Sequence, residues 1–472
     1  MIRFLAERCN LCGGCIPICP VDAISLRNGR LDFSENCTDC GLCVPICPHG
    51  ALLDENETSR EWPEIRPLHD FYDIVVIGGG PAGSTAARKA SETGASVLLI
   101  EKKRVVGIPQ LCGEGISRSG LTRVLPDIRE NWVAAPIEGA ILVSPRGNRT
   151  TVKHPNAGYV LERRVFDRDL FGMAADSGAR TLINAETTGL IWEDDHIVGV
   201  EFDYRARRRQ VFGRILIAAD GIESAVARWL FHDNRLTESD IHTAAQVVMS
   251  GVEVEVGFPE FHIGRKIAPG GYAWIFPKGT RRANVGLGIN PSLPEARKAT
   301  AWQMLSNFIE KRFGGEGEII EIAGGNVPTA RRLPRIAYRN IMFVGDAGRL
   351  TDPVSGGGIA TALLSGAIAG SLAAESLKWK TPEQLESALG AYSNIWDKAR
   401  GKQLAFYSRA KEVYSRLPDP ELESICRFID ERFGHGSYDG IDIPGTLKAI
   451  LRRRGLLWQL FKALFPGTGR SI

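Results

Sequence analysis

The stretch Tyr72–Ala90, YDIVVIGGGPAGSTAARKA, decides the fold expected for this chain of 472 residues. The run Asp73–Ile77 has the apolar pattern of a buried strand, and a G-x-G-x-x-G motif follows it at the turn into a helix. A second apolar run, SVLLIE, ends at Glu101. The motif glycines are Gly78, Gly80 and Gly83. This order predicts a dinucleotide site, with backbone amides on the pyrophosphate and Glu101 on a ribose hydroxyl.

Eight of the ten cysteines lie in two similar runs ahead of that stretch, CNLCGGCIPICP from Cys9 and CTDCGLCVPICP from Cys37. Both runs read C-x2-C-x2-C-x3-C-P, the spacing of bacterial-type [4Fe–4S] sites, in which the fourth cysteine binds the other cluster. Zinc sites use spaced cysteine pairs, and structural disulfides need an oxidising compartment. Residues 1–53 resemble a bacterial-type two-cluster ferredoxin. The expected ligand sets are Cys9, Cys12, Cys15 and Cys47 for one cluster, and Cys37, Cys40, Cys43 and Cys19 for the other.

Composition sets few limits on function. The net charge of +3 and the pI near 8.3 indicate no nucleic-acid partner. The N-terminus, MIRFLAERC, lacks the apolar core of a signal peptide, which together with the clustered thiols predicts a cytoplasmic protein. The uncharged run Ser355–Ala374 is long enough to cross a bilayer, but its Gly, Ala and Ser content favours a helix packed against the sheet.

Three later stretches indicate which dinucleotide is bound. ILIAADGIESAVAR (Ile215–Arg228) and NIMFVGDAGRLTDPVSGGGIATA (Asn340–Ala362) each run from a strand into a turn with Asp and Gly, and YVLERRVFDRDL (Tyr159–Leu170) contains Arg-x-x-Phe-Asp. They resemble the motifs of the FAD-dependent family shared by aromatic hydroxylases, flavin halogenases and geranylgeranyl reductases. The resemblance implies that Asp346 binds the ribityl chain and that Arg163 lies near the cofactor; a surface salt bridge is the alternative for Arg163.

The same resemblance implies a helix N-terminus that faces the flavin pyrimidine, where its amides would stabilise the negative charge of reduced flavin. The fold class is then α/β, with an α+β ferredoxin module, a Rossmann-like FAD-binding domain of this type, an inserted β-rich substrate domain and a helical C-terminus. The residues expected to bind FAD are Gly78, Gly80, Ala82, Gly83, Glu101, Lys102, Cys112, Gly113, Gly115, Arg163, Thr187, Asp220, Gly221, Asp346, Gly357, Gly358 and Ile359.

Two further motifs narrow the family. PQLCGEGIS (Pro109–Ser117) looks like the Cys-Gly-x-Gly-Ile-Ser segment of archaeal geranylgeranyl reductases, and PGGYAWIFP (Pro269–Pro277) looks like their Pro-x-x-Tyr-x-Trp-x-Phe-Pro motif. The first implies that Cys112 and its neighbouring glycines border the isoalloxazine ring. In the second, alternation puts three aromatic side chains on one strand face, either as the wall of a prenyl tunnel or as ordinary core. The three are Tyr272, Trp274 and Phe276.

The chain is most similar to the archaeal reductases that saturate digeranylgeranylglycerophospholipids. This implies a prenylated lipid substrate, a low-potential electron donor, and iron–sulfur clusters that feed a flavin able to release hydride from N5. Cys112 and Tyr272 are the candidate proton donors, and ordered water is a third. Two alternatives stay open: another prenyl substrate, such as a chlorophyll precursor or a polyprenyl quinone, and an electron conduit similar to electron-transfer-flavoprotein:quinone oxidoreductases.

The motifs also predict the order of domains. The C-terminal stretch Gly445–Gly467 has the pattern of a basic amphipathic helix at about 445–466, either lying on an anionic membrane surface or docked on the FAD-binding domain. Cys426, ahead of it, is expected to be buried in a helix. The expected order is a ferredoxin domain at 1–53, a linker at 54–70, the FAD-binding domain at 71–377 with substrate-facing parts at about 105–160 and 240–330, and a helical region at 378–472.

Overall fold

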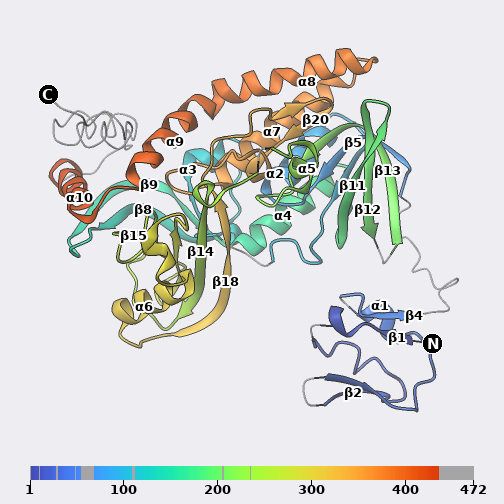
Figure 1. Ribbon diagram of the computed structural model, residues 1–472, viewed down its shortest axis with the longest axis horizontal. Coiled ribbons are helices and arrows are strands. Elements are labelled where there is room, and N and C mark those ends of the chain that lie inside the picture. Colours follow the sequence, from blue (N-terminus) through green and yellow to red (C-terminus); the bar gives the residue numbers. More distant parts are fainter. Residues whose placement is uncertain are drawn as a thin grey trace.

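A computed structural model gives the fold of the chain (Figure 1). It describes residues 2–9, 11–27, 30–47, 49–54, 68–108, 112–204, 207–233 and 235–434. Most of the expected linker and the expected basic helix at 445–466 lie outside these ranges. The described chain contains two eight-stranded sheets and, in its N-terminal part, two small two-stranded sheets. The mixed α/β fold expected from the sequence is confirmed.

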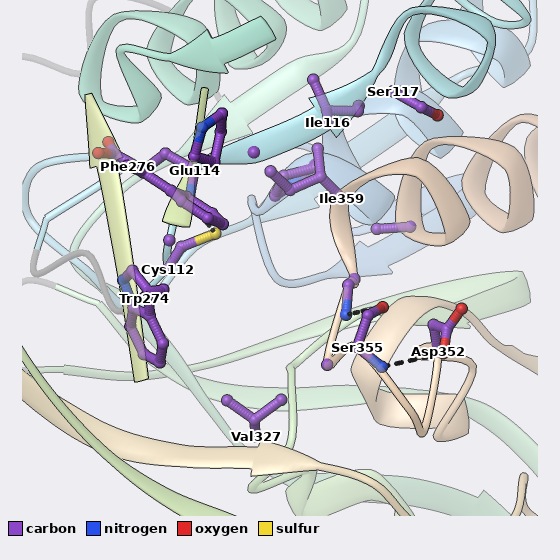
Figure 2. Close-up of a pocket in the computed structure, with 18 of the residues that line it drawn as sticks. Cys112, Glu114, Ile116, Ser117, Trp274, Phe276, Val327, Asp352, Ser355 and Ile359 are labelled. Atoms are coloured by element: carbon purple, nitrogen blue, oxygen red, sulfur yellow. Dashed lines mark hydrogen bonds between the residues drawn. The ribbon is translucent and has the colours of Figure 1, made fainter. Parts of the chain in front are cut away.

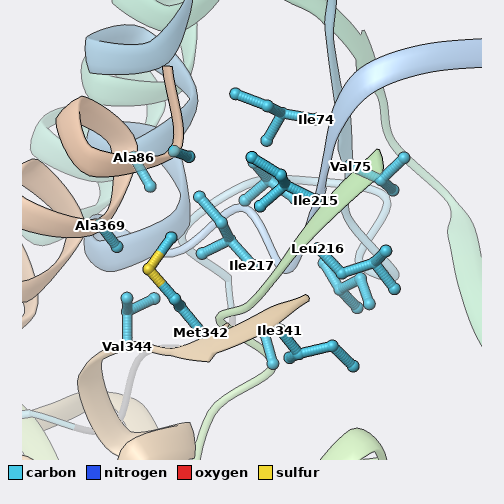
Figure 3. Packing of buried hydrophobic residues seen from close by; sticks show 14 of the residues in the cluster. Ile74, Val75, Ala86, Ile215, Leu216, Ile217, Ile341, Met342, Val344 and Ala369 are labelled. Carbon is cyan, nitrogen blue, oxygen red and sulfur yellow. The ribbon is translucent and has the colours of Figure 1, made fainter. Parts of the chain in front are cut away.

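The first large sheet is built on parallel strands that are apolar on both faces. β5 (Phe71–Ile77) pairs in parallel with β6 (Val97–Ile100) and with β13 (Arg207–Ala218), and β13 pairs in parallel with β20 (Ile341–Phe343). The strand order is β10-β6-β5-β13-β12-β11, with β20 and β19 joined to β13. Figure 3 shows the packed apolar side chains of the central strands. The other strands are β10 (Arg180–Leu182), β11 (Ala185–Glu193), β12 (His196–Tyr204) and β19 (Ala337–Tyr338).

Helices α2 (Pro81–Ser91) and α7 (Ile359–Ser376) pack closely together beside this sheet. At Gly366 and Gly370 of α7 an added Cβ would overlap backbone carbonyl groups of α2, so glycine is needed for this close approach. Among the described helices, α7 is the one long and apolar enough to cross a bilayer, and more than half of that window is buried. The composition of Ser355–Ala374 predicts a helix packed against the sheet. Ala369 does face the sheet core (Figure 3), but the main partner of α7 is another helix, because its small residues permit backbone contact.

The second large sheet has the order β18-β14-β17-β16-β15-β8-β9-β7. Helix α6 (Ala301–Phe313) covers one face, where Leu305 and Phe308 share a buried cluster with Val285 and Leu287 of β17. The other face carries the aromatic side chains of β16. The strands are β7 (Gly115–Ser117), β8 (Val133–Val143), β9 (Arg149–Leu161), β14 (Ile241–Ser250), β15 (Glu260–Ile263), β16 (Tyr272–Pro277), β17 (Arg282–Ile289) and β18 (Glu318–Pro328).

The C-terminal helices pack against both large sheets. Helix α8 (Pro382–Trp396) continues through a π-helical turn, Asp397–Gly401, into α9 (Lys402–Tyr414), and the three form one long rod (Figure 1). Helix α10 (Asp419–Phe433) is held on β9 by side-chain hydrogen bonds from Asn148 to Glu423 and from Thr150 to Asp430. Cys426 is buried in α10, as expected.

The N-terminal module is small. β1 (Ile2–Phe4) pairs with β4 (Leu52–Asp54) and so joins the two ends of the module, β2 (Ile24–Arg27) pairs with β3 (Arg30–Phe33), and α1 (Cys43–Ile46) lies between β3 and β4 in sequence. Its buried apolar cluster is Cys15, Ile24, Leu31, Cys43 and Leu52. Two of the five side chains in this apolar cluster are therefore cysteines that the sequence predicts to be iron–sulfur ligands.

Candidate active site

A continuous cavity of about 1210 Å³ lies where the two large sheets meet. The turns after β5, β13 and β20 line one side of it, and strands β8, β9, β14 and β16 line the other. The dinucleotide motifs and the aromatic strand therefore share one space. The sequence-predicted residues that line it are Gly80, Ala82, Cys112, Gly113, Gly115, Arg163, Gly221, Tyr272, Trp274, Phe276, Asp346, Gly357, Gly358 and Ile359.

The glycine turn after β5 has the shape of a pyrophosphate cradle. An added Cβ at Gly83 would overlap the carbonyl oxygen of Gly78, whereas one at Gly80 would stand in open space at the cavity. Glu101 braces the turn from behind, since Oε2 accepts from the Gly79 amide at 2.6 Å and Oε1 accepts from the Lys103 amide at 2.7 Å. The bare backbone beside a helix N-terminus fits the diphosphate of FAD.

The start of α7 forms a second part of this cradle. The first amides of a helix have no acceptor within the helix, and the N-cap Gly358 and the first residue Ile359 both line the cavity. Asp346 lies beside them: its Oδ1 accepts from the Thr351 hydroxyl at 2.7 Å, and burial raises the pKa of its carboxyl. Amides and a carboxylate that face one cavity fit a ligand with both carbonyl and hydroxyl groups, as FAD has.

The segment Cys112–Gly115 is held in a strained conformation by buried polar groups. Glu114 has φ +70°, the left-handed region that side chains rarely adopt. Its Oε2 accepts from Lys278 Nζ at 2.7 Å and from Asn284 Nδ2 at 3.2 Å, and Asn284 Nδ2 also donates to the Cys112 carbonyl at 2.8 Å. The Cys112 amide donates to Gln246 Oε1 at 2.9 Å. The backbone of this segment is thus fixed from two strands, β14 and β17.

The Cys112 thiol points into the cavity. Figure 2 shows its sulfur beside the Phe276 ring, and an added Cβ at Gly113 would come within 2.7 Å of that ring. Burial raises the pKa of the thiol, while the nearby Arg163 guanidinium opposes the rise. Burial alone would lower the pKa of Arg163, but its ion pair with Asp167, at 2.8 Å, raises it. Arg163 is therefore a buried cation and not the surface salt bridge considered as its alternative.

The aromatic residues of β16 form one wall of the cavity. Trp274 and Phe276 are almost fully buried and point into it (Figure 2), and Phe261 packs between the rings of Phe276 and Tyr272 at centroid distances of 5.4 and 5.6 Å. Trp274 Nε1 donates to Asn284 Oδ1 at 2.9 Å, so one asparagine ties this strand to the Cys112 segment. The Tyr272 hydroxyl donates to the Ser355 carbonyl, and burial raises the pKa of its phenol.

Several expected cofactor residues lie behind the cavity or away from it. Gly78, Gly83 and Glu101 shape the turn without lining the space. Asp220 accepts from the amide of Val226 near the start of α5 (Ala225–Leu230), and Lys102 is an exposed side chain. The Thr187 hydroxyl, on β11, is buried, has no hydrogen-bond partner among the described residues and does not line the cavity. Direct contact of these residues with FAD stays a prediction.

The residues that hold the site together were not found from the sequence. Glu114 stood inside a quoted motif, yet its partner Lys278 lies 164 positions later and Asn284 lies 170 positions later. The only local signals were Lys278 directly after the aromatic motif and an asparagine, Asn284, within an otherwise apolar strand. A buried polar residue in such a strand usually has a specific partner.

The eight thiols of the N-terminal module gather around two separate hollows. Cys9, Cys12, Cys15 and Cys47 line one, and Cys19, Cys37, Cys40 and Cys43 line the other. Amides of Ala23 and Ala51 donate to the sulfurs of Cys19 and Cys47 at 3.2 Å, in equivalent positions of the two runs. Within the described residues no three Cys, His, Asp or Glu side chains converge tightly enough for a single metal ion. Four thiols spread around a hollow fit a larger iron–sulfur group.

Comparison with known proteins identifies the family. Residues 240–327 match the geranylgeranyl reductase catalytic domain, residues 73–225 match FAD dependent oxidoreductases, and residues 8–52 match the 4Fe-4S dicluster domain. A digeranylgeranylglycerophospholipid reductase from Methanosarcina acetivorans is 36% identical over 410 residues, which are 86% of this chain and 99% of that relative. The chain belongs to the geranylgeranyl reductase family. The family expected from the two cavity motifs is thereby confirmed.

Solved structures agree with this assignment. A geranylgeranyl bacteriochlorophyll reductase-like protein from Thermoplasma acidophilum superposes with a TM-score of 0.77 at 31% identity, over 84% of this chain and 99% of that one. The flavin-dependent brominase Bmp2 superposes with a TM-score of 0.59 at 18% identity over 81% of this chain and 98% of that one, which shows a shared fold alone. As a geranylgeranyl reductase family member, the chain is an oxidoreductase that acts on carbon–carbon double bonds, with an FAD-dependent oxidoreductase domain and a 4Fe-4S domain.

Proposed function

We propose that this chain saturates isolated double bonds of geranylgeranyl chains on a glycerophospholipid precursor of archaeal membranes. The observation that carries the proposal is the shared cavity, in which residues that fit FAD and the aromatic face of β16 line the same space. The relative from Methanosarcina acetivorans is a digeranylgeranylglycerophospholipid reductase by name, which supports this substrate class. The reaction belongs in the cytoplasm, with a peripheral membrane contact as the further expectation for residues 445–466.

FAD, when bound, supplies hydride from N5 of its reduced form, and the protein holds the alkene, excludes water and provides a proton. The amides at the start of α7 favour negative charge on the flavin. Trp274 and Phe276 give a prenyl chain an apolar surface, and burial of such a chain is favourable by about 25 cal/mol per Å² of apolar area. The Trp274 N–H is the one polar group of these two rings, and it already donates to Asn284, so both rings offer the prenyl chain an apolar surface.

Cys112 is the better candidate for the proton donor. Its raised pKa keeps the thiol protonated near neutral pH, and its S–H has no acceptor among the described residues. The hydroxyl of Tyr272 is already donated to the Ser355 carbonyl, so we assign Tyr272 to holding that loop against β16. The network of Glu114, Lys278 and Asn284 keeps the Cys112 segment fixed during turnover.

Electrons enter through two [4Fe–4S] clusters in this proposal. The division of the thiols into two sets of four, one around each hollow, supports two clusters with the crossed ligands expected from the sequence. An external low-potential donor, either a redox protein or a reduced cofactor, would load them. One-electron carriers that feed a flavin suit a two-electron reduction, because the flavin can collect both electrons before hydride transfer.

The test is anaerobic turnover with a panel of acceptors. The protein, reconstituted with FAD and iron–sulfur clusters, is reduced and given a digeranylgeranyl phospholipid, a geranylgeranylated chlorophyll precursor or a polyprenyl quinone, and the product masses are measured. The proposal expects a gain of two hydrogens per double bond with the phospholipid. A preference for another prenyl acceptor would change the substrate, and reduction of the quinone ring with no change in any prenyl chain would favour the electron conduit.

A further inference from the structure

One end of the cavity is polar, and the roles assigned above do not use it. Helix α9 and its π-helical turn bring Arg400, Gln403 and Tyr407 to the cavity, at a spacing that puts them on one helix face. His242 of β14 and Asp352 of the segment after β20 line the same cavity. We call these five residues the polar end.

His242 is a buried side chain with no hydrogen-bond partner within the described chain. The side chain is 8% exposed, and its shielded Nε2 has neither donor nor acceptor. Burial, with a smaller effect of Lys411, lowers the pKa of the ring to about 3, so the imidazole is neutral near pH 7 and carries one N–H donor. Since buried polar atoms nearly always have a partner, an unpaired nitrogen at a cavity wall indicates a partner that comes from a ligand.

The guanidinium of Arg400 has N–H donors that its protein partners do not use. Its Nη1 donates to Gln403 Oε1, and its Nη2 is 4.0 Å from Asp352 Oδ2, at the outer limit of an ion pair. Asp352 is already engaged, because its Oδ1 accepts from the amides of Val354 and Ser355, and burial raises the pKa of its carboxyl. A guanidinium has five N–H donors, so several remain for an anion in the cavity.

The helix that carries Arg400 is fixed next to His242. Lys411 Nζ donates to the carbonyl of Ser239 at 2.7 Å, and the Tyr414 hydroxyl donates to the carbonyl of Gly271 at 2.9 Å. Ser239 precedes His242 by three residues, and an added Cβ at Gly271 would lie 3.6 Å from His242 Cε1. These bonds hold the C-terminal half of α9 against the segments that flank His242.

A π-helical turn also has a defined effect on side-chain direction. The insertion of one residue rotates the following side chains by about 100° relative to an unbroken α-helix, and such turns are frequent at functional sites. At Gly401 in this turn, an added Cβ would displace the carboxylate of Asp397, which is paired with Arg332 at 3.1 Å. The turn thus sets which face of α9 meets the cavity.

We propose that the polar end is a subsite for the phosphate of the lipid headgroup, with Arg400 as its cation and with Gln403 and His242 as hydrogen-bonding groups. This inference rests on the proposed function, since it assigns one end of that cavity to the head of the same lipid. The apolar wall formed by Trp274 and Phe276 then takes the prenyl chains. An amphipathic cavity matches an amphipathic substrate, and a bidentate guanidinium suits phosphate oxygens.

The experiment compares two lipids with identical geranylgeranyl chains, one with a phosphate on the glycerol and one with a free hydroxyl. In the holoenzyme, Arg400→Met should raise KM for the phosphorylated lipid about 10- to 100-fold, as expected for loss of charged hydrogen bonds. The KM for the neutral lipid should stay within about twofold, and kcat should be unchanged. His242→Leu should raise the phospholipid KM by about fivefold, with rescue by His242→Gln. The matched control is Arg409→Met, on an exposed position of α9.

Inorganic phosphate separates the headgroup from a free ion. It should compete with the phosphorylated lipid in the wild type, and this competition should be lost in Arg400→Met. Equal effects of Arg400→Met on both lipids, or no effect on either, would overturn the subsite. A loss of phosphate inhibition with an unchanged phospholipid KM would mean that the site binds free phosphate, which also overturns it. If neither lipid is reduced by the wild type, the proposed function has failed instead.

Discussion

The N-terminal module and the FAD-binding domain are stabilised in different ways. In the module the buried apolar cluster has five members, of which Cys15 and Cys43 are two. The core around the first large sheet contains about forty buried apolar residues. A unit of roughly 50 residues rarely gains enough from its core alone and commonly needs a metal. We therefore expect the module to depend on bound iron–sulfur clusters for folding, and the FAD-binding domain to fold by packing before FAD binds.

The largest effect should follow from the loss of a buried thiol in the module. Cys15→Ser removes a proposed iron–sulfur ligand and a member of the buried cluster, so the module should lose at least half of its iron and its protection from protease. The FAD content should be unchanged. Iron analysis, flavin absorbance and limited proteolysis measure these three quantities.

The matched control for Cys15→Ser is Cys426→Ser, a buried cysteine outside the module. It should leave the iron content as in the wild type. Loss of FAD together with iron in Cys15→Ser would break the comparison, because it would show that the two regions fold as one unit.

The next effect concerns the polar network of the FAD-binding domain. Lys278→Met leaves Glu114 buried without its cation and should cost about 3–5 kcal/mol in the free energy of unfolding. Denaturant unfolding of the FAD-binding domain measures the loss, and Glu114→Gln in the same chain should restore part of it. Arg282→Met, which removes only a half-exposed partner of Glu162, should cost less than about 1 kcal/mol. Equal losses for both substitutions would contradict the role given to the buried pair.

A smaller loss of stability is expected from a substitution in the glycine turn after β5. Gly83→Ala forces a Cβ against the Gly78 carbonyl and should cost about 3 kcal/mol with a clear fall in FAD affinity, since overpacking against backbone cannot relax easily. Flavin retention after gel filtration and thermal unfolding test this. Gly172→Ala, in helix α4 (Arg163–Asp176) with open space around it, is the control and should stabilise by about 0.5–1 kcal/mol. Normal FAD binding by Gly83→Ala would remove the steric argument for the cradle.

The smallest effect is a shift in reactivity with pH. Because burial raises the pKa of Cys112, its thiol stays protonated to a higher pH than an ordinary cysteine, and alkylation of the FAD-free protein by iodoacetamide should accelerate only at a pH above that at which an exposed cysteine reacts. Arg163→Met should move the profile further upward, since it removes the cation that opposes the rise. Peptide mass analysis identifies the modified cysteine. A thiol that reacts at full rate near pH 7 would show that Cys112 is a thiolate and not a proton donor.

The sequence predicted the parts of this protein whose signals are local. Strand, glycine turn and helix around Gly83, the two thiol runs, and the alternation that puts Trp274 and Phe276 on one strand face all depend on neighbours within a few positions. The thiols that line each hollow are the four that the spacing rule groups together, and their role as ligands of two clusters stays a prediction.

What the sequence did not predict depends on long-range pairing. Glu114 meets Lys278 and Asn284 only after β7, β16 and β17 assemble in one sheet. Arg400 reaches the cavity through a π-helical turn, and the residues of that turn have no motif of their own. The contribution of α9 to the cavity was therefore missed, although the helix itself was expected.

The most direct test of the central claim is a single turnover without oxygen. The fully reduced protein is mixed with digeranylgeranyl phospholipid, and flavin reoxidation is followed while samples are quenched for product mass. The account predicts that the flavin is oxidised at the rate at which a product heavier by two hydrogens appears, and that Cys112→Ala slows both. Flavin that stays reduced in the presence of the lipid, or that is reoxidised with no change in lipid mass, would contradict the claim that one cavity holds both partners of the reaction.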